Sequence, residues 1–127
     1  MAKSNEATWV KRVSDVEGKT VHAACTKAVL HTTPASESSV FHVAPGGEVR
    51  PHLHSSSWDL FMGMGGEGEI TFVEEASPRT VSMASGSFCA IPPQTVHAVR
   101  NVGQTAFSFL LIHAPYEGYD HRAAELG

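Results

Sequence analysis

Short apolar or alternating segments, separated by glycine, proline and asparagine, fill the chain from Thr20 to His113. Glycine permits turns with positive φ, and proline fixes φ and removes a donor for strand pairing. No segment keeps the period of an amphipathic helix. Many short strands at such intervals are typical of an all-β sandwich or barrel. The expected strands are Thr20–Leu30, Ser38–Ala44, Val49–His54, Trp58–Met64, Glu67–Val73, Arg79–Met83, Ser87–Ile91, Val96–Asn101 and Thr105–His113.

The length of the chain, 127 residues, favours a single domain. We expect the all-β domain to cover residues 20–115. Residues 1–19 are expected to form an N-terminal arm or an edge strand, with Trp9–Val16 as the candidate strand. Residues 116–127 are expected to form a C-terminal tail or a short helix. The Gly65-Gly66 pair lies between two expected strands and predicts a tight hairpin.

Charge and hydropathy exclude several classes of function. The net charge of −4 leaves no basic surface for nucleic acid and no polybasic segment for anionic lipid. No apolar run approaches the roughly 18 residues that span a bilayer, and no apolar stretch of a secretion signal follows the polar start. We therefore expect no nucleic-acid or membrane partner and a cytoplasmic location. Cys25 and Cys89 are expected to be small buried hydrophobic residues rather than a disulfide.

Histidine is frequent in this chain, with eight residues, and three of them lie where they could meet. His52 and His54 are separated by one residue, so on a strand both side chains point to the same face. Asp59 follows after a serine-rich break, and His97 comes just after a pair of prolines. A His-x-His pair in isolation is usually not a ligand pair. Three imidazoles with one carboxylate, however, would suit one divalent transition metal such as iron, manganese, nickel, copper or zinc.

Two gapped patterns surround these residues. The first reads Gly46, five residues, His52-Leu53-His54, four residues, Asp59, six residues, Gly66. The second reads Gly86, five residues, Pro92-Pro93-Gln94, two residues, His97, three residues, Asn101. In spacing and order these patterns resemble the two motifs of the cupin family. Two positions depart from the family pattern, since Asp59 replaces the usual glutamate and Gln94 replaces a glycine.

The resemblance implies a single-domain jelly-roll β-barrel with a metal inside it, near one mouth. The implied ligands are His52, His54, His97 and Asp59. Because aspartate is one methylene shorter than glutamate and metal–carboxylate distances are tight, Asp59 could ligate directly, act through a water or not ligate. Gln94 is expected to alter the turn near His97 and to add an amide close to the site.

Two further histidines are candidates for a general acid or base. His42 and His113 lie on expected strands before and after the two patterns, and imidazole titrates near neutral pH. The alternative for each is a hydrogen-bonded structural or surface histidine. The sequence does not show which face of its strand each occupies. His22, His31 and His121 are expected to lie outside the site.

Three functions are compatible with this pattern. The first is a metal-dependent enzyme that acts on a small organic molecule by oxygenase, lyase, isomerase or cyclase chemistry. The second is a non-catalytic cupin that binds or senses a small molecule or a sugar, and the third is a barrel whose metal is only structural. We favour the first. Since open jelly-roll edges favour strand pairing and compact cupins are commonly dimers, we also expect a homodimer.

Overall fold

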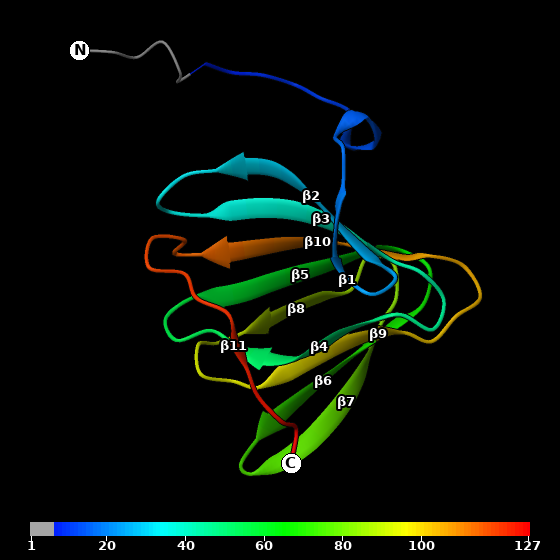
Figure 1. Cartoon of the computed structure of the whole chain (residues 1–127), viewed down its shortest axis with the longest axis vertical. Coiled ribbons are helices and arrows are strands. Elements are labelled where there is room, and N and C mark those ends of the chain that lie inside the picture. Colours follow the sequence, from blue (N-terminus) through cyan, green and yellow to red (C-terminus); the bar gives the residue numbers. More distant parts are fainter. Residues whose placement is uncertain (1–6) are drawn as a thin grey trace.

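The computed structural model describes residues 7–127, which form two antiparallel sheets that face each other (Figure 1). The order of the six-stranded sheet is β1 (Lys19–His22), β2 (Cys25–Thr32), β3 (Glu37–Val43), β10 (Phe107–Ala114), β5 (Trp58–Gly65), β8 (Phe88–Ile91). The order of the five-stranded sheet is β11 (Arg122–Ala123), β4 (Glu48–Leu53), β9 (His97–Asn101), β6 (Gly68–Glu74), β7 (Ser77–Met83). The fold is therefore the all-β jelly roll that the sequence predicts.

Buried and partly exposed side chains alternate along β10, and the buried ones form part of the interior. Phe107, Phe109, Leu111 and His113 are buried, and the residues between them are partly exposed. Because successive side chains on a strand point to opposite faces, the parity that buries the two phenylalanines also carries His113 into the molecule. Phe109 stacks on Phe41 of β3, with ring centroids 5.1 Å apart. The apolar core thus extends directly to a buried histidine.

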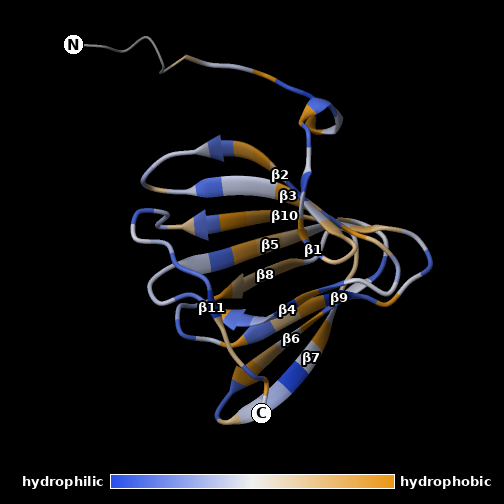
Figure 2. Cartoon of the chain, viewed as in Figure 1, coloured by the Kyte–Doolittle hydropathy of each residue, from blue (hydrophilic) through white to orange (hydrophobic). Residues whose placement is uncertain are grey.

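The core between the sheets is contributed by most of the strands, and apolar residues run along β2, β10 and β5 (Figure 2). Both cysteines are free. Cys25 is buried in the core as expected, whereas Cys89 is only partly buried and packs against the core. The core residues are Cys25, Phe41, Val43, Val49, Phe61, Ile70, Met83, Ile91, Val99, Phe107, Phe109 and Leu111.

The hairpin predicted at Gly65-Gly66 is wrong. β5 pairs with β10 and β8, whereas β6 pairs with β9 and β7, so the glycines carry the chain from one sheet to the other. Gly66 has a φ of +78°, and a Cβ there would collide with the carbonyl group of Ala106. The glycine pair predicts a sharp turn correctly, but long-range strand pairing decides which strands the turn connects.

At each end, one of the two expected forms is absent from the described residues. Trp9–Val16 contains a short 3₁₀ helix, Val13–Asp15, and no strand, and residues 1–6 of the expected arm lie outside the described part. Residues 116–127 contain no helix; they carry β11, which pairs with β4 at the edge of the smaller sheet. Between residues 7 and 127, no helix is long and apolar enough to cross a bilayer.

The inter-sheet turn generates a test of the fold. Gly66→Ala should lower the free energy of unfolding by about 2 kcal/mol, because alanine is strained at positive φ and its Cβ meets backbone. Gly65→Ala is the matched control, since a Cβ at Gly65 meets nothing within 4 Å. Urea unfolding of both variants measures the difference. Equal stability of the two variants would contradict this account of the turn.

Candidate metal centre

Four buried side chains converge between the sheets. His52 is on β4, His54 directly follows that strand, Asp59 is on β5 and His97 is on β9. One ligand atom from each lies within 4.8 Å of the others, and all four residues are at most 4% exposed. His52 lies opposite His97 in the pairing of β4 with β9, whereas Asp59 reaches the cluster from the other sheet. The structure thus brings together all four residues that the sequence analysis assigns as candidate ligands.

The Nδ1 atoms of the three histidines are each held by a backbone carbonyl group. The pairs are His52 with Arg50 at 2.7 Å, His54 with Asp120 at 2.7 Å and His97 with Thr95 at 2.9 Å. A carbonyl oxygen only accepts hydrogen bonds, so Nδ1 carries the proton and a neutral ring presents a lone pair at Nε2. Metal-binding histidines are commonly oriented in this way.

The Asp59 carboxylate is surrounded by imidazoles. His54 Nε2 and His97 Nε2 each lie 2.9 Å from its Oδ2, and His113 Nδ1 lies 2.5 Å from its Oδ1. Burial acts to raise the pKa of Asp59, but the close contacts with the three histidine rings outweigh this effect and hold the pKa well below its usual range. The carboxylate is therefore ionised. Burial, with a contribution from His97, lowers the pKa of His52 to about 3, so this ring is neutral.

These contacts fit a bound cation. With Nδ1 protonated, neutral His54 and His97 have no proton at Nε2 to donate, so two lone pairs face Asp59 Oδ2 at 2.9 Å. The repulsion between these lone pairs and the carboxylate oxygen must be compensated by added protons or by a positive ion. Burial acts to lower the pKa of His54, yet the contacts with Asp59 outweigh it and the pKa is raised. Three imidazole nitrogens and a carboxylate oxygen, all buried, are a donor set that suits a divalent transition metal.

His113 and His42, the two candidate acids or bases, lie in different places. His113 is opposite Asp59 in the pairing of β10 with β5, is buried, and binds the carboxylate oxygen that the other two histidines leave free. This geometry suits a residue that positions Asp59. His42 is exposed, and its Nδ1 lies 2.7 Å from the hydroxyl group of Ser108. It directly follows buried Phe41, so strand alternation turns it outward, away from the cluster.

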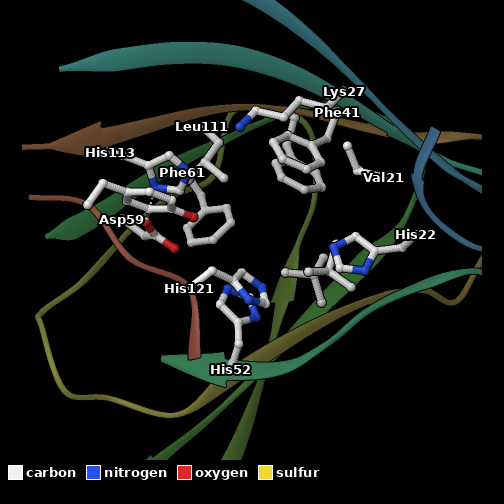
Figure 3. Close-up of a pocket in the computed structure, with 14 residues that line it drawn as sticks. Val21, His22, Lys27, Phe41, His52, Asp59, Phe61, Leu111, His113 and His121 are labelled. Carbon is white, nitrogen blue, oxygen red and sulfur yellow. Dashed lines mark hydrogen bonds and ion pairs between the residues drawn. The ribbon is translucent and has the colours of Figure 1, made fainter. Parts of the chain in front are cut away.

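A cavity of about 300 Å³ adjoins the cluster (Figure 3). Asp59, His52 and His113 lie at one side of it. Most of the remaining wall is apolar and comes from both sheets. These apolar residues are Val21, Phe41, Val49, Phe61, Val99, Phe109 and Leu111. A mostly apolar cavity with a few polar groups is typical of a small-molecule site.

Three residues that the sequence analysis does not assign to the site also line this cavity, namely His22, Tyr119 and His121. The expectation that His22 and His121 lie outside the site is wrong. His121 stacks on His52 with ring centroids 4.3 Å apart, and the ring of Tyr119 lies 4.4 Å from that of His113. The one signal in the sequence is the Tyr-x-His spacing, which places both side chains on one face of an extended segment.

The segment that carries Tyr119 and His121, residues 116–124, is referred to here as the C-terminal strap. Its strand β11 pairs Ala123 with His52 of β4. The carbonyl oxygen of Asp120 accepts from His54 Nδ1. The carboxylate of Asp120 accepts from the backbone N–H of Ser55 at 2.7 Å and from its hydroxyl group at 2.6 Å. The strap is thereby fixed beside the cluster and orients one of the candidate ligands.

Gln94, the departure from the second motif, supports the same region of the chain. Its φ of +69° is in the left-handed region that favours glycine, the residue usual at this motif position. Its backbone N–H donates to the carbonyl of His54 at 2.8 Å, and its side-chain amide donates to the carbonyl of Ser55 at 2.9 Å. The amide binds the main chain beside the cluster and does not line the cavity.

The strap generates a prediction about metal retention. Asp120→Ala removes both hydrogen bonds to Ser55 and loosens the carbonyl that orients His54, so we expect metal affinity to fall about 10-fold. The asparagine of Asp120→Asn can still accept from the backbone N–H of Ser55, so this variant should keep part of the metal affinity that Asp120→Ala loses. Competition with a coloured chelator measures the affinity. Glu125→Ala, an exposed change on the same tail, is the control. An Asp120→Ala protein with unaltered affinity would contradict this role.

Comparisons with solved structures agree with the fold. An uncharacterized conserved protein with a double-stranded beta-helix domain from Klebsiella pneumoniae is 22% identical, with a TM-score of 0.76 over 93% of this chain and 100% of that chain. The polyketide cyclase RemF from Streptomyces resistomycificus is 18% identical, with a TM-score of 0.78 over 95% of this chain and 88% of that chain. These similarities show the fold alone.

An oxalate decarboxylase from Lactobacillus farciminis is also similar, with 18% identity and a TM-score of 0.73 over 87% of this chain. This chain covers only 34% of that larger protein. No curated protein matches the sequence. A family model described as a cupin domain matches residues 39–113, which is more than half of the chain and includes all four residues of the cluster. The chain therefore belongs to the cupin family.

Proposed function

We propose that this cupin binds one divalent transition metal on His52, His54, His97 and Asp59, and that it is an enzyme acting on a small organic molecule in the adjacent cavity. One observation carries the proposal. Three buried imidazoles, each with its Nδ1 bound to a backbone carbonyl, converge with one buried carboxylate beside a mostly apolar cavity, and two of them place Nε2 at 2.9 Å from that carboxylate.

The residues around the cavity have distinct parts in this proposal. Its apolar walls exclude water from the bound molecule. A bound metal would supply Lewis acidity toward a carbonyl or enolisable group. His113 holds the Asp59 carboxylate in place through its Nδ1. Burial raises the pKa of Tyr119 far above neutrality, so this residue keeps its proton and presents a hydroxyl donor beside the cavity.

The class of reaction remains broad in this proposal. Structures of similar fold include an oxalate decarboxylase and a polyketide cyclase, whose names refer to a dicarboxylate and to a polyketide. Both kinds of compound offer oxygen atoms to a metal. We therefore propose a substrate with at least one carbonyl, carboxylate or enol oxygen, and oxygenase, lyase, isomerase or cyclase chemistry. Fold does not choose between these reactions.

Metal content is the direct test of the proposed centre. The purified protein should contain about one equivalent of a divalent transition metal, and the double variant His52→Ala/His97→Ala should contain almost none, because half of the donor set is gone. His42→Ala, an exposed histidine outside the cluster, is the control and should retain the metal. Elemental analysis by mass spectrometry measures all three. Equal metal content in wild type and double variant would refute the centre.

The enzymatic part of the proposal is tested with the metal-loaded protein. Carbonyl, hydroxy-acid and phenol substrates are incubated with it, and oxygen uptake and product formation are followed. Turnover that the His52→Ala/His97→Ala variant lacks supports an enzyme. A protein that binds metal and carries an unreacted small molecule or sugar, without turnover in any assay, would instead support a binding or sensing function.

We propose in addition that the protein forms a homodimer through the outer face of the six-stranded sheet. Met62 of β5 lies directly opposite Phe88 of β8, and they are 41% and 65% exposed. Trp58 and Met64, also on β5, are exposed on this face. An exposed apolar patch of this kind is typical of an interaction surface, and a second copy offers an equally apolar partner.

The dimer is tested by light scattering at micromolar concentration. The wild type should have the mass of two chains, and Met62→Glu/Phe88→Glu should have the mass of one, because two buried carboxylates would oppose the interface. Val102→Glu changes an exposed apolar residue elsewhere and should leave the mass unchanged. A monomeric wild type would refute this proposal without affecting the metal centre.

A further inference from the structure

A lysine is part of the cavity wall. Lys27 of β2 lies opposite Phe41 of β3 in the strand pairing and shares its inward face. Its Nζ lies 2.7 Å from Oε1 of Glu37, and the two side chains are only 19% and 7% exposed. Figure 3 shows the ammonium group extending over the cavity on the side of Leu111 and His113. Among the described residues that line the cavity, Lys27 is the one lysine or arginine, and its position needs an explanation.

The ammonium group of Lys27 has more N–H donors than it has acceptors among the described residues. A lysine carries three N–H donors, and within residues 7–127 Glu37 is the one hydrogen-bond acceptor and ion-pair partner found for Lys27 Nζ. The nearest aromatic face, that of Phe41, has its centroid 5.7 Å away. Donors that are largely shielded from water and lack acceptors are costly. An oxygen atom of a molecule in the cavity would satisfy them.

The strand register places this group at a useful distance from the metal centre. Glu37 lies opposite His113 on β10, and His113 lies opposite Asp59 on β5. Two strand spacings, about 10 Å in all, therefore separate the backbones of Glu37 and Asp59, with His113 between them. The ammonium group of Lys27 and the carboxylate of Asp59 are thus two separate charged groups in the wall of one cavity.

Apart from His113, most of the nearby cavity wall is apolar. Phe41, Phe61, Phe109 and Leu111 are among the apolar residues that line the cavity. A cavity of about 300 Å³ lies at the lower end of the range for small-molecule sites. A ligand that contacts both charged groups must be small, with an apolar body and a polar atom for each of them.

We propose that Lys27 binds the carboxylate of a small organic acid whose apolar, ring-sized body fills the cavity and whose other end carries an oxygen function directed at the His52–His97 cluster. The second part rests on the proposed metal function; the first does not. Glu37 holds the ammonium group in place and, by its negative charge, weakens the attraction for a second carboxylate. The alternative is an ordinary buried ion pair with no ligand.

The proposed carboxylate site and an ion pair without a ligand predict different effects of the Glu37→Gln substitution on acid binding. Binding of benzoate, 4-hydroxybenzoate and cinnamate is measured by calorimetry, each against its neutral amide of nearly the same shape. For at least one pair the wild type should prefer the acid by about 10-fold, the value expected for a charge-assisted hydrogen bond. Glu37→Gln should increase this preference, because it removes the competing charge. Lys27→Met should reduce it to about one.

Matched variants keep the test informative. Lys27→Met leaves Glu37 buried without its partner, so Lys27→Met/Glu37→Gln is measured beside it and should also show no preference for the acid. Lys11→Met, an exposed lysine outside the cavity, should keep the wild-type preference. Circular dichroism and the Tm establish that each variant is folded.

Three outcomes overturn the proposal: no acid binds better than its amide, the preference survives Lys27→Met, or Glu37→Gln fails to increase it. The same titrations on the metal-free variant His52→Ala/His97→Ala separate this proposal from the metal function. A preference for the acid that persists there supports Lys27 even if no metal centre exists. A preference present only in metal-loaded protein assigns the carboxylate to the metal and overturns the role of Lys27.

Discussion

The buried carboxylate of Asp59 is the group on which the rest of the site depends. It comes from the six-stranded sheet, and two of its three imidazole partners, His54 and His97, belong to the other side of the molecule. An ionised carboxylate is stable in an apolar interior only when its oxygens are bound by donors or cations. Asp59 and the three imidazoles around it therefore also link the two sheets at one end of the core.

The polar centre and the apolar core use the same strand alternation. Along β10 the inward positions pass from Phe107 through Leu111 to His113, so a histidine occupies a place that a hydrophobic residue would otherwise fill. A polar residue at such an inward position reduces apolar packing but provides a chemical group, which is common at functional sites. Backbone carbonyls then fix each imidazole through Nδ1, so the site is oriented before any ligand arrives.

Several features of the site follow from tertiary contacts between distant segments. Tyr119 and His121 reach the cavity because β11 pairs with β4, although they lie far from β4 in sequence. The pair formed by Lys27 and Glu37 gains its position in the cavity from the register of β2 with β3. The cavity is thus bounded by strands from both sheets and by the C-terminal strap, and no single segment contains its binding groups.

Local sequence determined the class of fold and the candidate ligands, because turn residues, strand alternation and the spacing of His52 and His54 act over a few residues. It also predicted the sharp turn at Gly65-Gly66, but not that this turn crosses between sheets. Only the tertiary structure decided that His42 faces outward and that His121 faces the cavity. The reason is physical: which face of a strand is buried depends on its register with partners far along the chain, and short-range patterns do not contain that register.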